Sequence, residues 1–134
     1  MKIIFISAII IFISDFSIGQ TINNSAADSL INTLKSGTSL EDFNKILNTN
    51  KYVLVDFYAD WCLPCKQLAP VIATIAHEMK DKVIVVRINQ DNNKSLMDEL
   101  KVWELPTILI YKNQNIEWTG IGFFGKEIIE EELK

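Results

Sequence analysis

Two cysteines, Cys62 and Cys65, lie at the junction of a predicted strand and a predicted helix, and this junction most constrains the fold. Residues 53–58 are apolar, β-branched or aromatic except for Asp56, a pattern typical of a buried central strand. After Cys65, apolar residues recur at helical spacing: Leu68, Val71, Ile72, Ile75 and Met79. The sequence therefore places the cysteines where a helix begins.

This position favours redox chemistry. A helix N-terminus has unpaired N–H groups and the positive end of the helix dipole, so it stabilises a thiolate and lowers the pKa of the first cysteine. Two thiols at this spacing can close a disulfide within one turn of helix. The competing interpretation is a metal half-site, but structural zinc needs four ligands, and the chain has no further cysteine and a single histidine, His77. Haem attachment would need a histidine where Lys66 stands.

Asp56 interrupts the buried strand with a carboxylate. Burial of a lone carboxylate is costly and raises its pKa. A pKa raised toward neutrality suits a group that carries a proton. We therefore interpret Asp56 as a functional acid rather than a solvated strand residue.

The rest of the chain alternates strands and helices. Helices are predicted at 40–47, from the cysteines to about residue 79, at 95–101 and at 126–133, and further strands at 83–88, 108–111 and 116–121. A capping box, Thr38 to Glu41, opens the first helix. This order predicts an α/β fold: a three-layer sandwich with a central mixed β-sheet flanked by helices. With 134 residues and a net charge of −4, the chain fits one domain and no nucleic-acid partner.

The N-terminal segment has the pattern of an export signal. Lys2 precedes an apolar run over residues 3–13, and Ser17 and Gly19 precede a predicted cleavage site at Gln20. We predict a signal peptide at 1–19, a flexible lead-in at 20–37, a redox domain at 38–134 and a periplasmic or other extracytoplasmic location. The alternative is an uncleaved segment that anchors the protein in the membrane.

The cysteine stretch, residues 53–66, together with Leu105-Pro106-Thr107 about forty residues later, closely resembles thioredoxin. The resemblance covers residues 40–133 and implies the thioredoxin fold. It implies that Cys62 is an exposed nucleophile, that Cys65 is a buried resolving thiol and that Asp56 assists proton transfer. It also implies a substrate-binding surface with a cis proline: Trp61, Leu63, Pro64, Leu105, Pro106 and Gly122.

The chain departs from the family at a few positions. Leu63 stands where thioredoxins usually have glycine, and Trp103-Glu104 stand where a small residue is usual. Arg87 matches the lysine that usually pairs with the buried acid, and Phe123-Phe124 follow Gly122. The export signal is absent from cytosolic members, so the resemblance is to exported bacterial relatives.

The resemblance implies a monomeric enzyme that reduces protein disulfides at Cys62 and Cys65. No glycine motif for a nucleotide or flavin occurs, so we expect no cofactor, no metal and an external reductase as electron donor. The alternative is a binding module that docks a partner through exposed aromatic residues, with incidental redox activity. The potential, and thus the direction of exchange, does not follow from Leu63 and Pro64.

Overall fold

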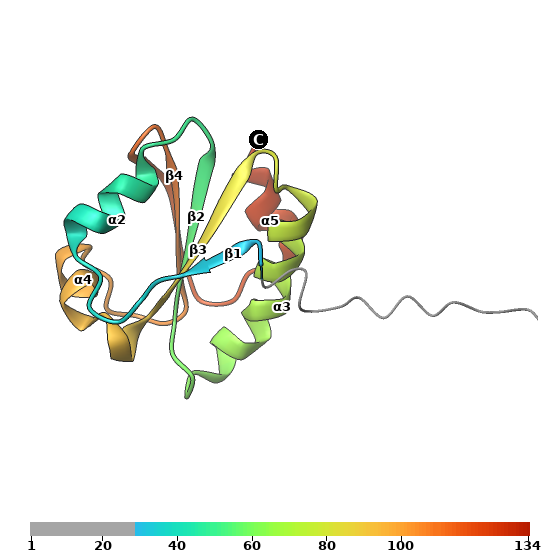
Figure 1. Ribbon diagram of the computed structural model, residues 1–134. Coiled ribbons are helices and arrows are strands. Elements are labelled where there is room, and N and C mark those ends of the chain that lie inside the picture. Colours follow the sequence, from blue (N-terminus) through green and yellow to red (C-terminus); the bar gives the residue numbers. More distant parts are fainter. Residues whose placement is uncertain (1–28) are drawn as a thin grey trace, which may run out of the picture.

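The computed structural model describes residues 29–134. Its centre is a mixed five-stranded sheet in the order β1-β3-β2-β4-β5 (Figure 1). The strands β1, β2 and β3 are parallel, and β4 and β5 join by antiparallel pairing. The strands are Ile31–Thr33 (β1), Tyr52–Tyr58 (β2), Val83–Asn89 (β3), Thr107–Lys112 (β4) and Asn115–Ile121 (β5).

Helices cover both faces of the sheet. Figure 1 shows α2 and α4 on one side and α3 and α5 on the other. Their bounds are Leu40–Leu47 (α2), Leu63–Glu78 (α3), Lys94–Glu99 (α4) and Lys126–Glu131 (α5). This arrangement confirms the predicted α/β three-layer sandwich, with element positions close to those that the sequence indicated.

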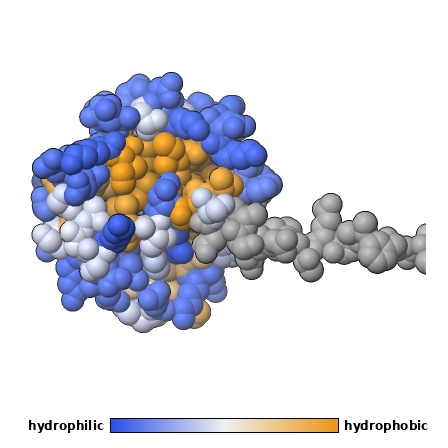
Figure 2. All heavy atoms as spheres, viewed as in Figure 1, coloured by the Kyte–Doolittle hydropathy of each residue, from blue (hydrophilic) through white to orange (hydrophobic). Residues whose placement is uncertain are grey.

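Strand β2 organises the core because both of its faces are buried. Val53, Val55 and Phe57 pack with the cluster under α2 and α4, whereas Leu54 packs with the cluster under α3 and α5. Figure 2 has the same view as Figure 1. Hydrophobic residues gather in the middle, where the sheet lies, and hydrophilic residues surround them. The unbroken apolar run of the central strand therefore reflects burial on both sides.

The hairpin between β4 and β5 is tight. Asn113 and Gln114 connect the strands, with φ values of 49° and 68°. Two consecutive residues with positive φ are typical of a type I′ turn, whose twist matches that of the flanking strands. This turn makes β5 the edge of the sheet opposite β1.

Two predictions at the start of the domain were wrong. Residues 31–33, expected in a flexible lead-in, form β1 because they pair in parallel with Val85, Val86 and Arg87 of β3. The N-cap of α2 is Ser39 and not Thr38: the Ser39 hydroxyl accepts the N–H of Asp42, whereas the Thr38 hydroxyl donates to the Lys35 carbonyl.

Two further findings concern the segment after β3 and the N-terminal part of the chain. A short 3-10 helix, Gln90–Asn92, follows β3 and was not predicted. The signal peptide predicted at 1–19 lies outside the described residues. Over residues 29–134, no helix has the length and apolar character needed to cross a membrane.

Candidate active site

The two cysteines form a disulfide at the point where β2 gives way to α3. Cys62 is the N-cap of α3, and Cys65 lies in its first turn. Their sulfur atoms are 2.05 Å apart, and the backbone N–H of Cys65 donates to Cys62 Sγ at 3.3 Å. The Cys62 sulfur thus lies at the positive end of the helix, where a negative charge on it is stabilised.

Both cysteines are buried in this disulfide state. Cys62 is 5% exposed and Cys65 is 2% exposed, so the exposed Cys62 that the resemblance implied is not found here. The physical reason is local packing: the two cysteines form a cluster with Ala59, and Tyr58 and Leu105 pack against it.

A loop from a distant part of the sequence borders the disulfide. The Leu105–Pro106 peptide bond is cis, and Leu105 packs against the cysteines. The Pro106 carbonyl accepts the N–H of Gly122 at 2.8 Å. Gly122 has a φ of +101°, a conformation that favours glycine. The structure therefore brings together the cysteine pair and the segments at 105–106 and 122 that the sequence predicted as one site.

Asp56 is buried in β2 and forms an ion pair with Arg87 of β3. Asp56 is 0% exposed, and the Arg87 Nε donates to its Oδ2 at 2.8 Å. Its Oδ1 has no hydrogen-bond partner among the described residues. Burial raises the pKa of Asp56 above its ordinary value, while the charge and hydrogen bond of Arg87 oppose that rise.

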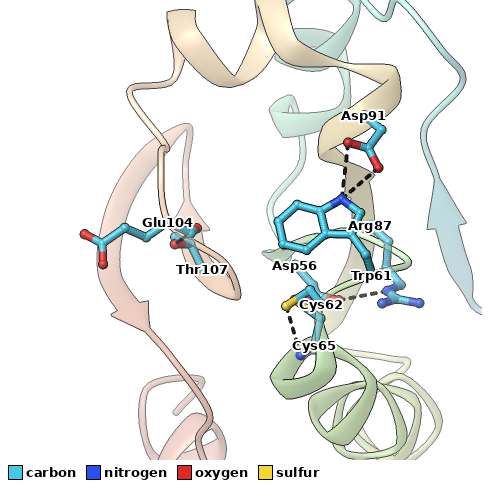
Figure 3. The surroundings of a disulfide bond; sticks show 8 residues. All are labelled: Asp56, Trp61, Cys62, Cys65, Arg87, Asp91, Glu104 and Thr107. Carbon is cyan, nitrogen blue, oxygen red and sulfur yellow. Dashed lines mark hydrogen bonds and ion pairs between the residues drawn. A yellow bond between two sulfur atoms is a disulfide. The ribbon is translucent and has the colours of Figure 1, made fainter.

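Two contacts around the site were not predicted. The Arg87 guanidinium lies over the Tyr58 ring, with Cζ 3.8 Å from the ring centroid. The Trp61 indole N–H donates to the Asp91 carboxylate, at 3.1 Å to Oδ2 and 3.4 Å to Oδ1 (Figure 3). Asp91 lies in the unpredicted 3-10 helix, and no spacing in the sequence links it to Trp61.

Exposed apolar side chains flank Cys62 in the chain, and another follows Gly122. Trp61 and Leu63 are each 66% exposed, and Phe123 is 52% exposed. Pro64, next to Leu63 at the start of α3, is also exposed. A protein that reacts with this disulfide must therefore approach across an apolar rim. In the described part of the chain, no three His, Cys, Asp or Glu side chains are grouped so as to hold a metal.

Comparison with known proteins identifies the family. The sequence model of the family described as Thioredoxin matches residues 14–134. The chain belongs to the thioredoxin family.

Similar relatives are thioredoxins from bacteria. The chain is 40% identical to a thioredoxin of Rickettsia typhi over 67% of this chain and 86% of that protein. It is also 40% identical to the thioredoxin of Bacillus subtilis, over 59% of this chain and 76% of that protein.

Solved thioredoxin structures share the fold. A thioredoxin from Halobacterium salinarum aligns with a TM-score of 0.69 at 25% identity, covering 77% of this chain and 87% of that chain. The thioredoxin of Malassezia sympodialis gives a TM-score of 0.66 at 25% identity, covering 76% of this chain and 87% of that chain. The family and the close Cys62–Cys65 pair together identify the chain as a thiol–disulfide oxidoreductase that reduces disulfides. Proteins of this family act on protein disulfides with a partner reductase.

Proposed function

We propose that this thioredoxin-family protein reduces protein disulfides with Cys62 as nucleophile and Cys65 as resolving thiol. The observation that carries the proposal is the position of the disulfide at the start of α3. Cys62, as N-cap, is stabilised as a thiolate by the helix N-terminus. Cys65 lies inside the first turn and is the less exposed of the two.

The proposed reaction has two exchange steps. The Cys62 thiolate attacks one sulfur of the substrate disulfide, forms a mixed disulfide and releases a substrate thiolate, which takes a proton from solvent. The Cys65 thiol then loses its proton and attacks the Cys62 sulfur. This second attack forms the Cys62–Cys65 disulfide and releases the other substrate sulfur as a thiolate, which takes a proton from solvent. Two electrons pass from the enzyme to the substrate, and a partner reductase returns them.

Asp56 is the proposed acceptor of the Cys65 proton. It is buried among the residues that surround the disulfide (Figure 3), and burial raises the pKa of its carboxyl, which favours uptake of a proton by this group. Its Oδ1 makes no hydrogen bond in the described residues and can take up that proton. Arg87 holds only the other oxygen.

The proposed substrate surface consists of residues on three segments around the disulfide. These segments are the helix start, the cis-proline loop and the turn after β5, and their members are Trp61, Leu63, Pro64, Leu105, Pro106 and Gly122. The three apolar side chains nearest the cysteines in sequence are exposed. We propose that the protein is a monomer and that substrates bind to this surface of the single chain.

Insulin reduction by dithiothreitol tests the activity and its direction. The wild type should accelerate the precipitation of insulin chains, and Cys62→Ser should lose the acceleration. Repeating the assay across defined glutathione buffers gives the potential, and activity only in oxidising buffers would contradict the reductive direction. A protein that binds insulin without reducing it would support the binding-module alternative.

We further propose that the protein is exported and cleaved before Gln20. The support is the Lys2 start, the apolar run over 3–13 and the small residues Ser17 and Gly19. N-terminal sequencing of the protein from its native host should find Gln20 first. A retained Met1 in the membrane fraction would favour the anchored form instead.

A further inference from the structure

One face of the sheet is left uncovered along β5. Paired residues of antiparallel strands point to the same face, so Ile116 and Ile121 share a face with Tyr111 and Thr107 of β4. Tyr111 packs in the core cluster under α2 and α4, and this cluster includes no residue of β5. Ile116 is 53% exposed and Ile121 is 54% exposed. The α2/α4 layer therefore ends before the sheet does.

The segment that follows α4 forms the second wall of this region. Val102 is buried, whereas Trp103 beside it is 72% exposed. Together with the β5 side chains they enclose a groove of about 350 Å³, which we call the β5 groove. Its lining is mainly apolar: Leu100, Val102, Trp103, Leu109, Ile116 and Ile121.

The β5 groove is continuous with the surface around the disulfide. Trp103 and Glu104 run directly into the cis Leu105–Pro106 bond, and Ile121 directly precedes Gly122. The hydrogen bond from the Gly122 N–H to the Pro106 carbonyl joins the two walls at that end. Figure 3 shows the Glu104 side chain pointing away from the disulfide, so it does not stand between the two surfaces.

We propose that the β5 groove binds an apolar side chain of the disulfide-bearing polypeptide while its cysteine reacts at Cys62. This inference rests on the dithiol function proposed above. A mixed disulfide fixes the substrate chain at Cys62, and a chain leaving across Leu105–Pro106 reaches the groove. Two charged residues in the lining, Lys101 and Glu104, are of opposite sign, so the groove selects for apolar character rather than for charge.

The edge strand adds a reason to expect an extended segment. β5 is an outer strand of the sheet, and such a strand offers unpaired N–H and C=O groups to a further strand. An extended chain alternates its side chains, so apolar residues at every second position would face the groove. The groove then contributes to the reduction of polypeptides and not of small disulfides.

A pair of peptides tests the proposal on the full-length reduced protein. Each peptide holds its cysteine as a mixed disulfide with thionitrobenzoate. One alternates leucine and lysine on both sides of the cysteine, and the other has serine in place of leucine. The second-order rate of thionitrobenzoate release is measured for both peptides, and release from Ellman's reagent is the small-disulfide reference.

The wild type should react about five- to tenfold faster with the leucine peptide, the effect of ~1.0–1.4 kcal/mol of apolar contact. Ile116→Ser and Trp103→Ala should each remove most of this preference and leave the Ellman's reagent rate unchanged. Ile116→Val should retain it. Ile128→Ser is the matched control, because Ile128 is equally exposed, at 51%, but lies on α5 across the sheet.

A wild type without the preference, or groove variants that keep it, would overturn the proposal. An equal loss of the leucine preference in Ile128→Ser would also overturn it. The same holds if the groove variants lower the peptide rates and the Ellman's reagent rate by the same factor. A dimer in sedimentation that dissociates on Ile116→Ser would assign the groove to a second copy of the chain. Failure of the proposed function is distinct, since the reduced wild type would then release thionitrobenzoate from all three probes no faster than a simple dithiol such as dithiothreitol at the same concentration.

Discussion

Arg87 Nε lies 2.8 Å from Asp56 Oδ2, and this is the sole hydrogen bond of the Asp56 carboxylate over residues 29–134. The two residues are register partners on the parallel strands β2 and β3. The Arg87 side chain is 19% exposed, and its guanidinium is held over the Tyr58 ring. Asp56 therefore has a positively charged partner on the neighbouring strand.

We predict that Asp56→Asn changes the pH dependence of stability. Burial raises the pKa of Asp56 above its ordinary value of 3.8, so the protonated form favours the fold. The contribution of Asp56 to the free energy of unfolding is fully present below pH 3.8 and is lost as the pH rises through the raised pKa. Asp56→Asn should therefore gain stability over the wild type as pH rises to neutrality, on the order of 1–3 kcal/mol. Urea unfolding of the oxidised proteins at several pH values measures the difference, and a difference that does not vary with pH would contradict the prediction.

We predict losses of stability of different size for two substitutions of Arg87. Arg87→Gln leaves a buried carboxylate without its cation, so it should lower stability at neutral pH by about 3–5 kcal/mol and raise the Asp56 pKa further. Arg87→Lys keeps the charge but loses the planar stack on Tyr58, a loss of about 0.5–1 kcal/mol. Unfolding curves and a carbon NMR titration of the Asp56 carboxyl follow both effects. A lower Asp56 pKa in Arg87→Gln would show that Arg87 is not the group that opposes the rise.

The Trp61–Asp91 hydrogen bond predicts an effect on substrate reaction rather than on the fold. Both side chains are exposed, so Asp91→Ala should change the free energy of unfolding by no more than about 0.5 kcal/mol. It should slow the reaction of the reduced protein with insulin by about two- to fivefold, because the indole beside Cys62 loses its fixed orientation. Asp91→Asn keeps an acceptor oxygen and should react at nearly the wild-type rate. Equal slowing by both substitutions would point to the charge of Asp91 instead.

We predict that Cys62 is alkylated before Cys65 in the reduced protein at neutral pH. Cys62 is the N-cap of α3, where a thiolate is stabilised, while Cys65 lies a turn further in. Brief exposure to iodoacetamide followed by peptide mapping measures the order. Labelling of the unfolded protein in urea is the control, since both thiols should then react alike. Preferential labelling of Cys65 in the folded protein would reverse the two proposed roles.

Most of the fold could be predicted from the sequence because buried strands and helices show a regular spacing of apolar residues. The run at 53–58 predicted the central strand, and the helical spacing after Cys65 predicted α3. β1 was missed because three residues at a sheet edge have too short a pattern to show alternation. Its pairing with β3 is a tertiary contact that local sequence does not encode.

The site was predictable where it rests on neighbouring residues or on the family resemblance. The cysteine pair and buried Asp56 followed from local patterns, and the partnership with Arg87 followed from resemblance. Asp91 was not found because it reaches Trp61 through a 3-10 helix in a segment that reads as a polar turn. The burial of Cys62 was also missed, because part of its packing comes from Leu105, more than forty positions away.

Asp56→Asn also provides the sharpest test of the proposed chemistry. Attack by Cys62 depends on the helix N-terminus and should be nearly unaffected, but Cys65 would lose the group proposed to take its proton. The mixed disulfide with substrate should therefore clear more slowly, by about 10²–10⁴-fold if solvent cannot replace the carboxylate. Acid-quenched samples resolved on non-reducing gels follow its formation and decay. Cys65→Ser is the reference in which it does not clear, and Asp60→Asn is the matched control, because Asp60 is an exposed carboxylate in the loop between β2 and α3. If Asp56→Asn clears the mixed disulfide as fast as the wild type, Asp56 does not carry the proton, and its buried ion pair with Arg87 serves the fold alone.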